Sequence, residues 1–110
     1  MAETVSFAEF SKLELRVGKI MEVGRVEGSN KLYKLQVRVG GEERTLVAGL
    51  AQAYAEDELL GKLIVVVCNL ERKTLKGIES QGMLLAAETA DGEITLLAPD
   101  RPVADGSAVR

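Results

Sequence analysis

Basic side chains gather in the middle of this chain, where they could neutralise phosphate groups. One group lies in residues 28–41, which contain no carboxylate, and a second lies about 30 residues further along. The two groups comprise Lys31, Lys34, Arg38, Arg72, Lys73 and Lys76. Clustered lysine and arginine are typical of a surface that binds nucleic acid. An ordinary solvent-facing surface of mixed charge would give the same pattern, so both interpretations stand at this point.

The net charge of the whole chain argues the other way. Its 110 residues include 14 Lys and Arg against 17 Asp and Glu, a formal net charge of −3. However, residues 16–76 hold eleven basic and eight acidic side chains, a balance of +3, between ends that contribute −2 and −4. A basic surface can therefore exist on a chain that is acidic overall.

The chain lacks the groups on which most enzymes depend. It contains no histidine, which removes the usual base near neutral pH and a common zinc ligand. Its single cysteine, Cys68, excludes an internal disulfide and follows an apolar run in which burial would raise the thiol pKa. The acidic run Glu56–Glu58 fits the first turn of a helix better than a metal site. We therefore expect a binding protein with no catalytic residues, no cofactor and no metal.

Apolar residues that alternate with polar ones predict the strands that position the basic groups. Five principal strands are expected at 13–17, 33–39, 44–47, 62–70 and 83–87. Shorter elements are a helix capped by Ser6, a helical or looped stretch over 50–60, a polar connection over 71–80, a strand at 94–97 and an edge strand at 107–110. This pattern predicts an all-β fold: one domain over residues 1–110, a five-stranded Greek-key barrel of the OB type with short helices and appended terminal elements.

The positions of the cations and the scarcity of aromatics narrow the expected ligand. Lys34 and Arg38 share the face of their strand opposite its apolar side, and the second and third strands of an OB barrel form its usual nucleic-acid face. Binders of unstructured single strands stack bases on aromatic side chains. This chain has only two Phe and two Tyr, which favours recognition of a folded RNA through phosphate and sugar contacts.

The sequence also favours the cytoplasm. The residues from Met1 onward lack a basic segment followed by an apolar one, as a secretory leader would have. The longest apolar run, Leu63–Cys68, is far shorter than the roughly 20 residues that span a bilayer. A single cysteine suits a reducing compartment.

Residues 69–87, from Asn69 through the Ser80-Gln81-Gly82-Met83 run to Ala87, resemble the signature of the tRNA-binding OB-fold family. That family includes the C-terminal domain or beta subunit of methionyl-tRNA synthetase, free-standing tRNA-binding proteins, EMAP-II-like domains and CsaA-type chaperones. Further matches lie at 10–20, 30–33, 47–51 and 96–100, so the resemblance extends over roughly residues 5–110.

The resemblance implies a homodimer that binds the outer corner of the tRNA fold without reading its sequence, and that could assist an aminoacyl-tRNA synthetase in trans. The family positions implicated in RNA contact correspond here to Lys31, Arg44, Asn69, Ser80 and Met83. Lysine and arginine would neutralise phosphates, the amide and hydroxyl would bond phosphate, sugar or 2′-OH, and methionine would contact an unstacked base or sugar. With Arg72, Lys73 and Lys76 they form the predicted RNA site.

Two alternatives accompany this interpretation. Asn69 and Ser80 could instead cap loops and strand ends, and Met83 could lie in the core. On the same barrel, a CsaA-like chaperone would bind unfolded proteins through exposed apolar surface between its dimer halves. The dimer interface is expected at the N-terminal helix and the C-terminal strand region. The sequence departs from the family in the turn Glu27–Asn30, which is shorter and lacks the usual histidine, and at Ala48, where serine is usual.

Overall fold

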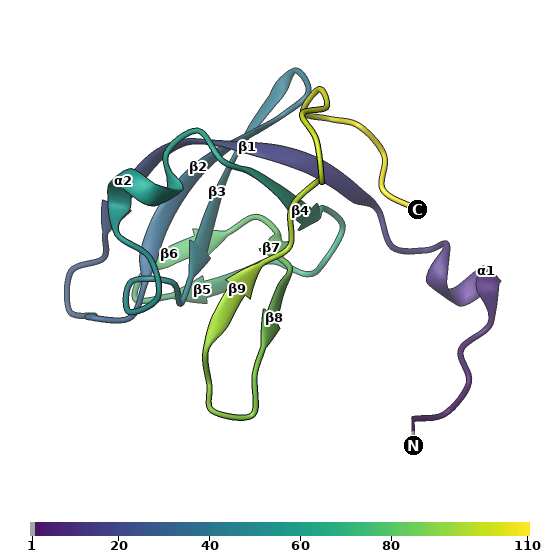
Figure 1. Ribbon diagram of the computed structural model, residues 1–110, viewed down its shortest axis with the longest axis horizontal. Helices are drawn as coiled ribbons and strands as arrows, with labels where there is room; N and C mark the ends of the chain where they lie inside the picture. Colours follow the sequence, from purple (N-terminus) through teal and green to yellow (C-terminus); the bar gives the residue numbers. More distant parts are fainter. Residues whose placement is uncertain (1) are drawn as a thin grey trace.

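One curled antiparallel sheet forms the framework of the protein (Figure 1). In this computed structural model, which describes residues 2–110, the strands of the sheet follow the order β3-β2-β1-β4-β7. Their bounds are Leu15–Arg25 for β1, Tyr33–Val39 for β2, Glu42–Ala48 for β3, Leu63–Val67 for β4 and Met83–Leu84 for β7. The predicted all-β class of OB type is confirmed.

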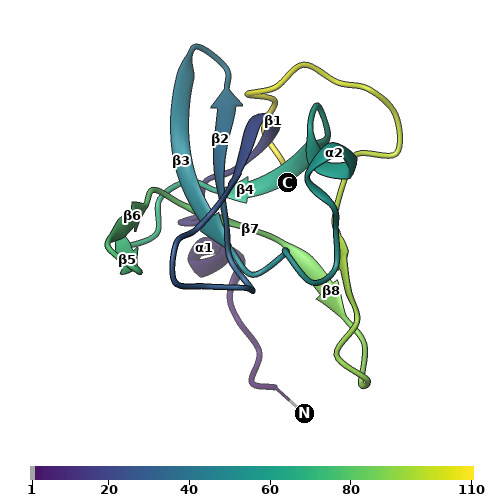
Figure 2. The same cartoon turned by 90° about the vertical axis from the view of Figure 1, so that its left-hand side faces the viewer.

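Smaller elements surround the sheet. Two one-turn helices are α1 (Phe7–Phe10) and α2 (Glu56–Leu59). Two separate hairpins pair β5 (Lys73–Leu75) with β6 (Ile78–Ser80), and β8 (Ala86–Glu88) with β9 (Ile94–Leu96). Figure 2 places these hairpins on opposite sides of the sheet, with β5–β6 on the left and β8 on the lower right.

The long strand β1 causes the sheet to curl. Its first half pairs with β4 and its second half with β2, and its register shifts between Ile20 and Glu22. Such a bulge bends a strand and increases its twist, so one strand can serve both sides of a barrel. Gly18 lies before this shift, opposite Ile64 of β4, and an added Cβ there would come within 2.6 Å of the side chain of Val37. The close approach of β1 and β2 therefore requires glycine there.

The alternation on β2 forms the centre of the core. Tyr33, Leu35, Val37 and Val39 are all buried, while the residues between them are not. They pack in one cluster with apolar side chains from the rest of the sheet and from the loops, which include Ile20, Leu46, Leu50, Leu59, Ile64 and Val66. Burial of each such side chain contributes about 1.5–3 kcal/mol, so the core fixes the barrel and leaves the other faces of its strands available.

Two predictions about elements need correction. The stretch 71–80, expected as a polar connection, folds into the β5–β6 hairpin around a Lys76–Gly77 turn in which both residues have positive φ. Three-residue strands are too short to produce a visible alternation. The predicted strand 83–87 divides at Leu85, since β7 pairs with β4 whereas β8 leaves with β9. The stretch 50–60, predicted as helical or looped, contains the single turn α2.

The two ends of the described chain lie on the same side of the barrel (Figure 1). The C-terminal segment runs beside β1 through a bridge between Arg16 and Ala108, close to the edge strand predicted at 107–110. The helix α1 is capped as predicted, with the Glu9 backbone N–H donating to Ser6 Oγ at 3.1 Å. It projects away from the sheet, and Phe7 remains 82% exposed.

Candidate nucleic-acid interface

The residues that follow β6 close the barrel against β3. The Gln81 backbone N–H donates to the Thr45 carbonyl at 2.8 Å, and the Thr45 N–H donates to Gln81 Oε1 at 2.8 Å. One step along, the Val47 N–H donates to Ser80 Oγ at 3.0 Å. The side chains of Ser80 and Gln81 thus accept hydrogen bonds from β3 that a regular neighbouring strand would accept through its backbone. These bonds hold the β5–β6 hairpin beside β3.

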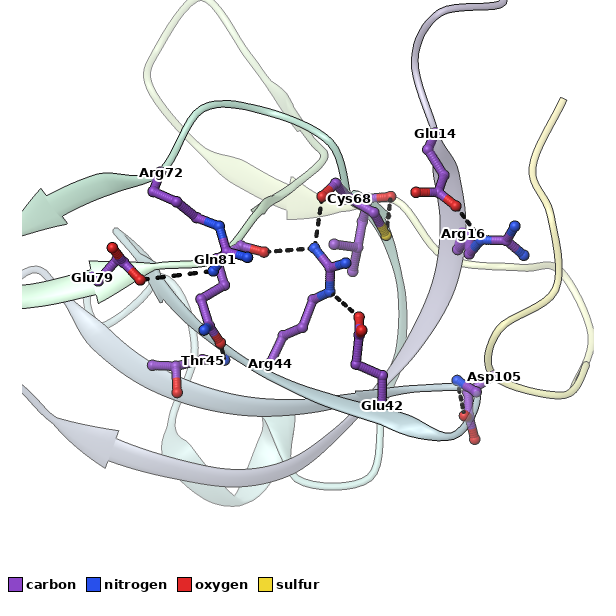
Figure 3. Close-up of polar contacts among 12 residues, drawn as sticks. Glu14, Arg16, Glu42, Arg44, Thr45, Cys68, Arg72, Glu79, Gln81 and Asp105 are labelled. Carbon is purple, nitrogen blue, oxygen red and sulfur yellow. Dashed lines mark hydrogen bonds and ion pairs between the residues drawn. The ribbon is translucent and has the colours of Figure 1, made fainter.

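Arg44 reinforces the same join (Figure 3). Its Nη1 donates to the Cys68 carbonyl at 2.6 Å and to the Gln81 carbonyl at 2.9 Å, while its Nε pairs with Glu42 at 2.6 Å. The side chain lies on the same face of β3 as the core residue Leu46 and is only 16% exposed. Its position at the end of the barrel makes Arg44 a structural bridge in the free protein.

Asn69 and Ser80, the other predicted polar contacts, also bond internally. Asn69 Nδ2 donates to the Lys12 carbonyl at 2.6 Å, and the Glu14 N–H donates to Asn69 Oδ1 at 2.8 Å. Ser80 is 5% exposed, and its hydroxyl donates to the Gly82 carbonyl besides accepting from Val47. Both side chains therefore perform the capping role considered as their alternative. Their part in RNA contact remains a prediction.

The predicted lysines, in contrast, are exposed. Lys73 and Lys76 lie on the β5–β6 hairpin and Lys31 lies in the β1–β2 loop, and none of the three forms an ion pair within residues 2–110. Arg72 pairs loosely with Glu79 across the hairpin at 3.7 Å. The loop and the hairpin tip both lie on the left-hand side of Figure 1.

The tip of the β5–β6 hairpin is unusual in its backbone. Lys76 has φ 50°, and no other non-glycine residue in 2–110 has a positive φ. Glycine or asparagine would adopt this conformation at lower cost, since a side chain there is destabilising by about 1–2 kcal/mol. An observed outlier of this kind is a reason to look for function in the side chain that occupies it.

A small pocket beside the hairpin brings three predicted residues together. It has a volume of about 210 Å³. Its lining consists of Val47, Leu70, Glu71, Lys73, Leu75, Ser80, Gly82 and Met83. Met83 is 50% exposed and so does not belong to the core, while Lys73 supplies a positive charge. The sequence had not indicated Leu70 and Leu75, because the strand pairing that places them here was not predicted.

Gly82 allows the chain to present Met83 at this pocket. Its φ of 151° is one that side chains disfavour, and an added Cβ would lie 3.0 Å from the Val67 carbonyl oxygen. Each residue of the Ser80–Met83 run thus has its own structural role. The Ser80 hydroxyl and the Gln81 amide bond β3, Gly82 allows a close approach to the Val67 backbone, and Met83 presents an exposed apolar side chain. Gln81, which was absent from the predicted site, could have been suspected from its place in this run.

Cys68 and the carboxylates form no second reactive site in the described residues 2–110. Burial raises the pKa of the Cys68 thiol, in agreement with the inert thiol expected from its apolar surroundings. Within residues 2–110, no group of three or more His, Cys, Asp or Glu is placed to hold a metal ion. No helix in that range is long and apolar enough to cross a membrane.

Comparison with known proteins gives a consistent family. A family model described as "Putative tRNA binding domain" matches residues 15–108. The chain is 56% identical over 107 residues to a methionine–tRNA ligase of Pyrococcus furiosus, covering 96% of this chain and 14% of that protein. It is 47% identical over 105 residues to the corresponding ligase of Caldanaerobacter subterraneus, covering 96% of this chain and 16% of the ligase. The chain thus spans only a small part of these curated relatives.

Solved structures agree with this relationship. A MetRS-related protein from Pyrococcus horikoshii superimposes with a TM-score of 0.94 at 39% identity, covering 99% of this chain and 100% of the other. A CsaA chaperone protein from Picrophilus torridus does so with a TM-score of 0.88 at 32% identity, covering 97% and 100%. The family model extends over most of the chain, and the strand order and the Ser80–Met83 geometry described above lie within its match. The chain belongs to the tRNA-binding domain family.

Proposed function

We propose that this chain binds folded tRNA through a surface formed by the β5–β6 hairpin, the pocket beside it and the β1–β2 loop. The observation that carries the proposal is the pocket in which Lys73 lies beside the half-exposed Met83, on a hairpin whose tip residue Lys76 is also exposed. Lys31, Lys73 and Lys76 would contact phosphates, and Arg72 could exchange its loose pairing with Glu79 for another phosphate. Such contacts position an RNA without reading its sequence.

Met83 would give the complex its apolar part. A methionine side chain adapts to irregular surfaces, and Leu70 and Leu75 extend the apolar lining beside it. A base at the outer corner of tRNA that is not fully stacked could lie against this pocket while its phosphate contacts Lys73. The proposed role is non-enzymatic, and it takes place in the cytoplasm.

The partner that we propose is an aminoacyl-tRNA synthetase for which this domain holds tRNA. The support is that its curated relatives are methionine–tRNA ligases, of which it matches about 14–16%. Co-purification of a synthetase with the tagged chain would support this partnership. Recovery of tRNA alone would leave the RNA-binding proposal intact and contradict the partnership.

We further propose that the chain acts as a homodimer joined through its N-terminal segment. Several apolar side chains there are exposed: Val5 at 63%, Phe7 at 82%, Phe10 at 42% and Leu13 at 43%. An apolar patch of this kind on a projecting helix suits an interface between subunits. Light scattering should give a dimer mass at micromolar concentration, and Phe7→Ala with Phe10→Ala should give a monomer of unchanged circular dichroism.

The principal test is a titration of the chain with folded tRNA and with a single strand of equal length that cannot fold. Tight binding to tRNA alone, weakening steeply as salt rises, is the expected result. Equal binding to both RNAs, or to neither, would contradict the proposal. Val103→Ala, which changes an exposed side chain outside the proposed surface, serves as the matched control.

A protein-binding chaperone is the second candidate. The exposed apolar N-terminal segment favours it, and so does the likeness to the Picrophilus torridus CsaA structure. Suppression of client aggregation that persists in excess tRNA and disappears in the Phe7→Ala, Phe10→Ala variant would support this function. Binding of tRNA with no effect on client aggregation would exclude it.

A further inference from the structure

Gln81 is attached to β3 through three of its polar atoms. Its backbone N–H and its Oε1 bond the carbonyl and N–H of Thr45, each at 2.8 Å, and its carbonyl accepts from Arg44 Nη1 at 2.9 Å. Figure 3 shows the Gln81 side chain reaching Thr45 while its carbonyl faces the Arg44 guanidinium. Gln81 directly follows β6, so these bonds connect the base of the β5–β6 hairpin to the barrel.

The hairpin depends on this attachment for its order. Its strands have three residues each and its two-stranded sheet is separate from the main one. A hairpin of that size is marginally stable by itself. Its tip also holds Lys76 in a disfavoured backbone conformation, which lowers its independent stability further. The bonds from Ser80 and Gln81 to β3 therefore help to restrict the direction in which Lys73 and Lys76 point.

The side chain of Gln81 accounts for a specific part of that restriction. Thr45 is half-buried, and its N–H has Oε1 of Gln81 as acceptor. Removing the acceptor leaves this donor without a protein partner and releases one of the bonds to β3. The backbone bond from Gln81 N–H to Thr45 remains, so the hairpin would loosen without detaching.

We propose that Gln81 is a positioning residue for RNA binding: three of its polar atoms bond the barrel, and the bond from the Thr45 N–H to its side-chain oxygen holds the β5–β6 hairpin ready for tRNA. The inference rests on the proposed function. Binding to an ordered hairpin avoids the entropy cost of fixing it in the complex, so loss of the amide lowers affinity without removing a phosphate contact. Arg44 acts at the same join through the Gln81 carbonyl.

The test compares Gln81→Met, which keeps the length of the side chain and removes the acceptor, with Gln81→Glu, which keeps an acceptor oxygen. Lys73→Ala is the matched variant that removes a proposed contact. Hydrogen exchange of the hairpin amides and tRNA affinity over a series of salt concentrations are measured for each. Wild-type protein supplies the reference for both measurements.

Gln81→Met is expected to speed hairpin exchange and to weaken tRNA binding roughly three- to tenfold, with the slope of log affinity against log salt unchanged. Lys73→Ala should leave the exchange of the hairpin amides at its wild-type rate and should make the slope of log affinity against log salt shallower. Gln81→Glu should retain slow exchange, and its added charge should weaken binding only at low salt.

Wild-type affinity in Gln81→Met, or a shallower salt slope in that variant, would overturn the positioning role while the proposed function stands. Faster exchange with no change in affinity would overturn it as well. Absence of tRNA binding by the wild-type chain would overturn both, and that outcome is recognised before any variant is compared.

Discussion

The β5–β6 and β8–β9 hairpins have similar architecture and opposite charge. Each pairs two three-residue strands outside the main sheet. The first exposes Lys73 and Lys76, whereas the second exposes Glu88, Asp91 and Glu93. Residues 77–100 contain no lysine or arginine at all. Phosphate contacts would therefore form at one hairpin and be repelled by the other.

The two hairpins also differ in their attachment. The β5–β6 hairpin joins β3 through the side chains of Ser80 and Gln81. The β8–β9 hairpin is joined to β4 through the Leu85 N–H, which donates to the Val65 carbonyl at 3.0 Å, and to the segment before α2 through the Leu96 N–H, which donates to the Tyr54 hydroxyl at 3.0 Å. Both attachments combine backbone and side-chain bonds, but the basic hairpin uses two side chains, Ser80 and Gln81, which can be changed one at a time.

The largest expected effect follows from removing both lysines of the basic hairpin. Each phosphate contact contributes about 0.7–0.9 to the salt slope, so Lys73→Ala with Lys76→Ala should lower affinity roughly 25- to 60-fold at 0.1 M salt. Fluorescence anisotropy with labelled tRNA at several salt concentrations measures both quantities. An unchanged slope would show that the hairpin does not contact phosphate.

Lys76→Gly should separate binding from stability. It removes one proposed contact, which corresponds to roughly a five- to eightfold loss of affinity at 0.1 M salt. It also relieves the left-handed conformation of Lys76, so the free energy of unfolding should stay the same or rise by up to about 1 kcal/mol. Denaturant titration checks the second expectation. Parallel loss of stability and affinity would mean that the tip has a structural role.

Neutralising the acidic hairpin should have a smaller and opposite effect. Glu88→Gln with Glu93→Gln removes two exposed negative charges without altering shape. We expect tRNA affinity to rise about two- to threefold at low salt and to return to the wild-type value near 1 M, where the Debye length is about 3 Å. Weaker binding by this variant would place RNA contacts on the hairpin that we consider repulsive.

Tyr54→Phe should leave tRNA affinity unchanged while it weakens the attachment of β9. The substitution removes the hydroxyl that accepts the Leu96 N–H, at a cost of about 1 kcal/mol. Thermal unfolding measures the loss, and the RNA titration gives the comparison. A clear fall in affinity would indicate that the two hairpins are coupled, contrary to the separate roles given to them here.

Particular residues show which parts of the fold and of the candidate site could be predicted from the sequence. The alternation over Tyr33–Val39 and the apolar run after Lys62 predicted two central strands, because burial on one or both faces leaves a pattern along the chain. The β5–β6 hairpin was missed, since its strands are too short for such a pattern and its turn begins with lysine. The bonds from the Arg44 guanidinium to two carbonyls of distant segments were not predicted, since no local pattern indicates them, and its contact with phosphate stays a prediction.

By itself, the sequence determined the fold class, the family signature and the presence of a basic middle segment in an acidic chain. Those properties follow from residue types and their spacing. Only the tertiary structure decided which polar residues remain exposed: Lys31, Lys73 and Lys76 do, while Arg44, Ser80 and Gln81 close the barrel. The physical reason is that the hydrogen-bond partners of a buried polar group come from strands that are far apart in the chain. Whether such a group finds a partner is therefore decided only when the sheet curls and brings those strands together.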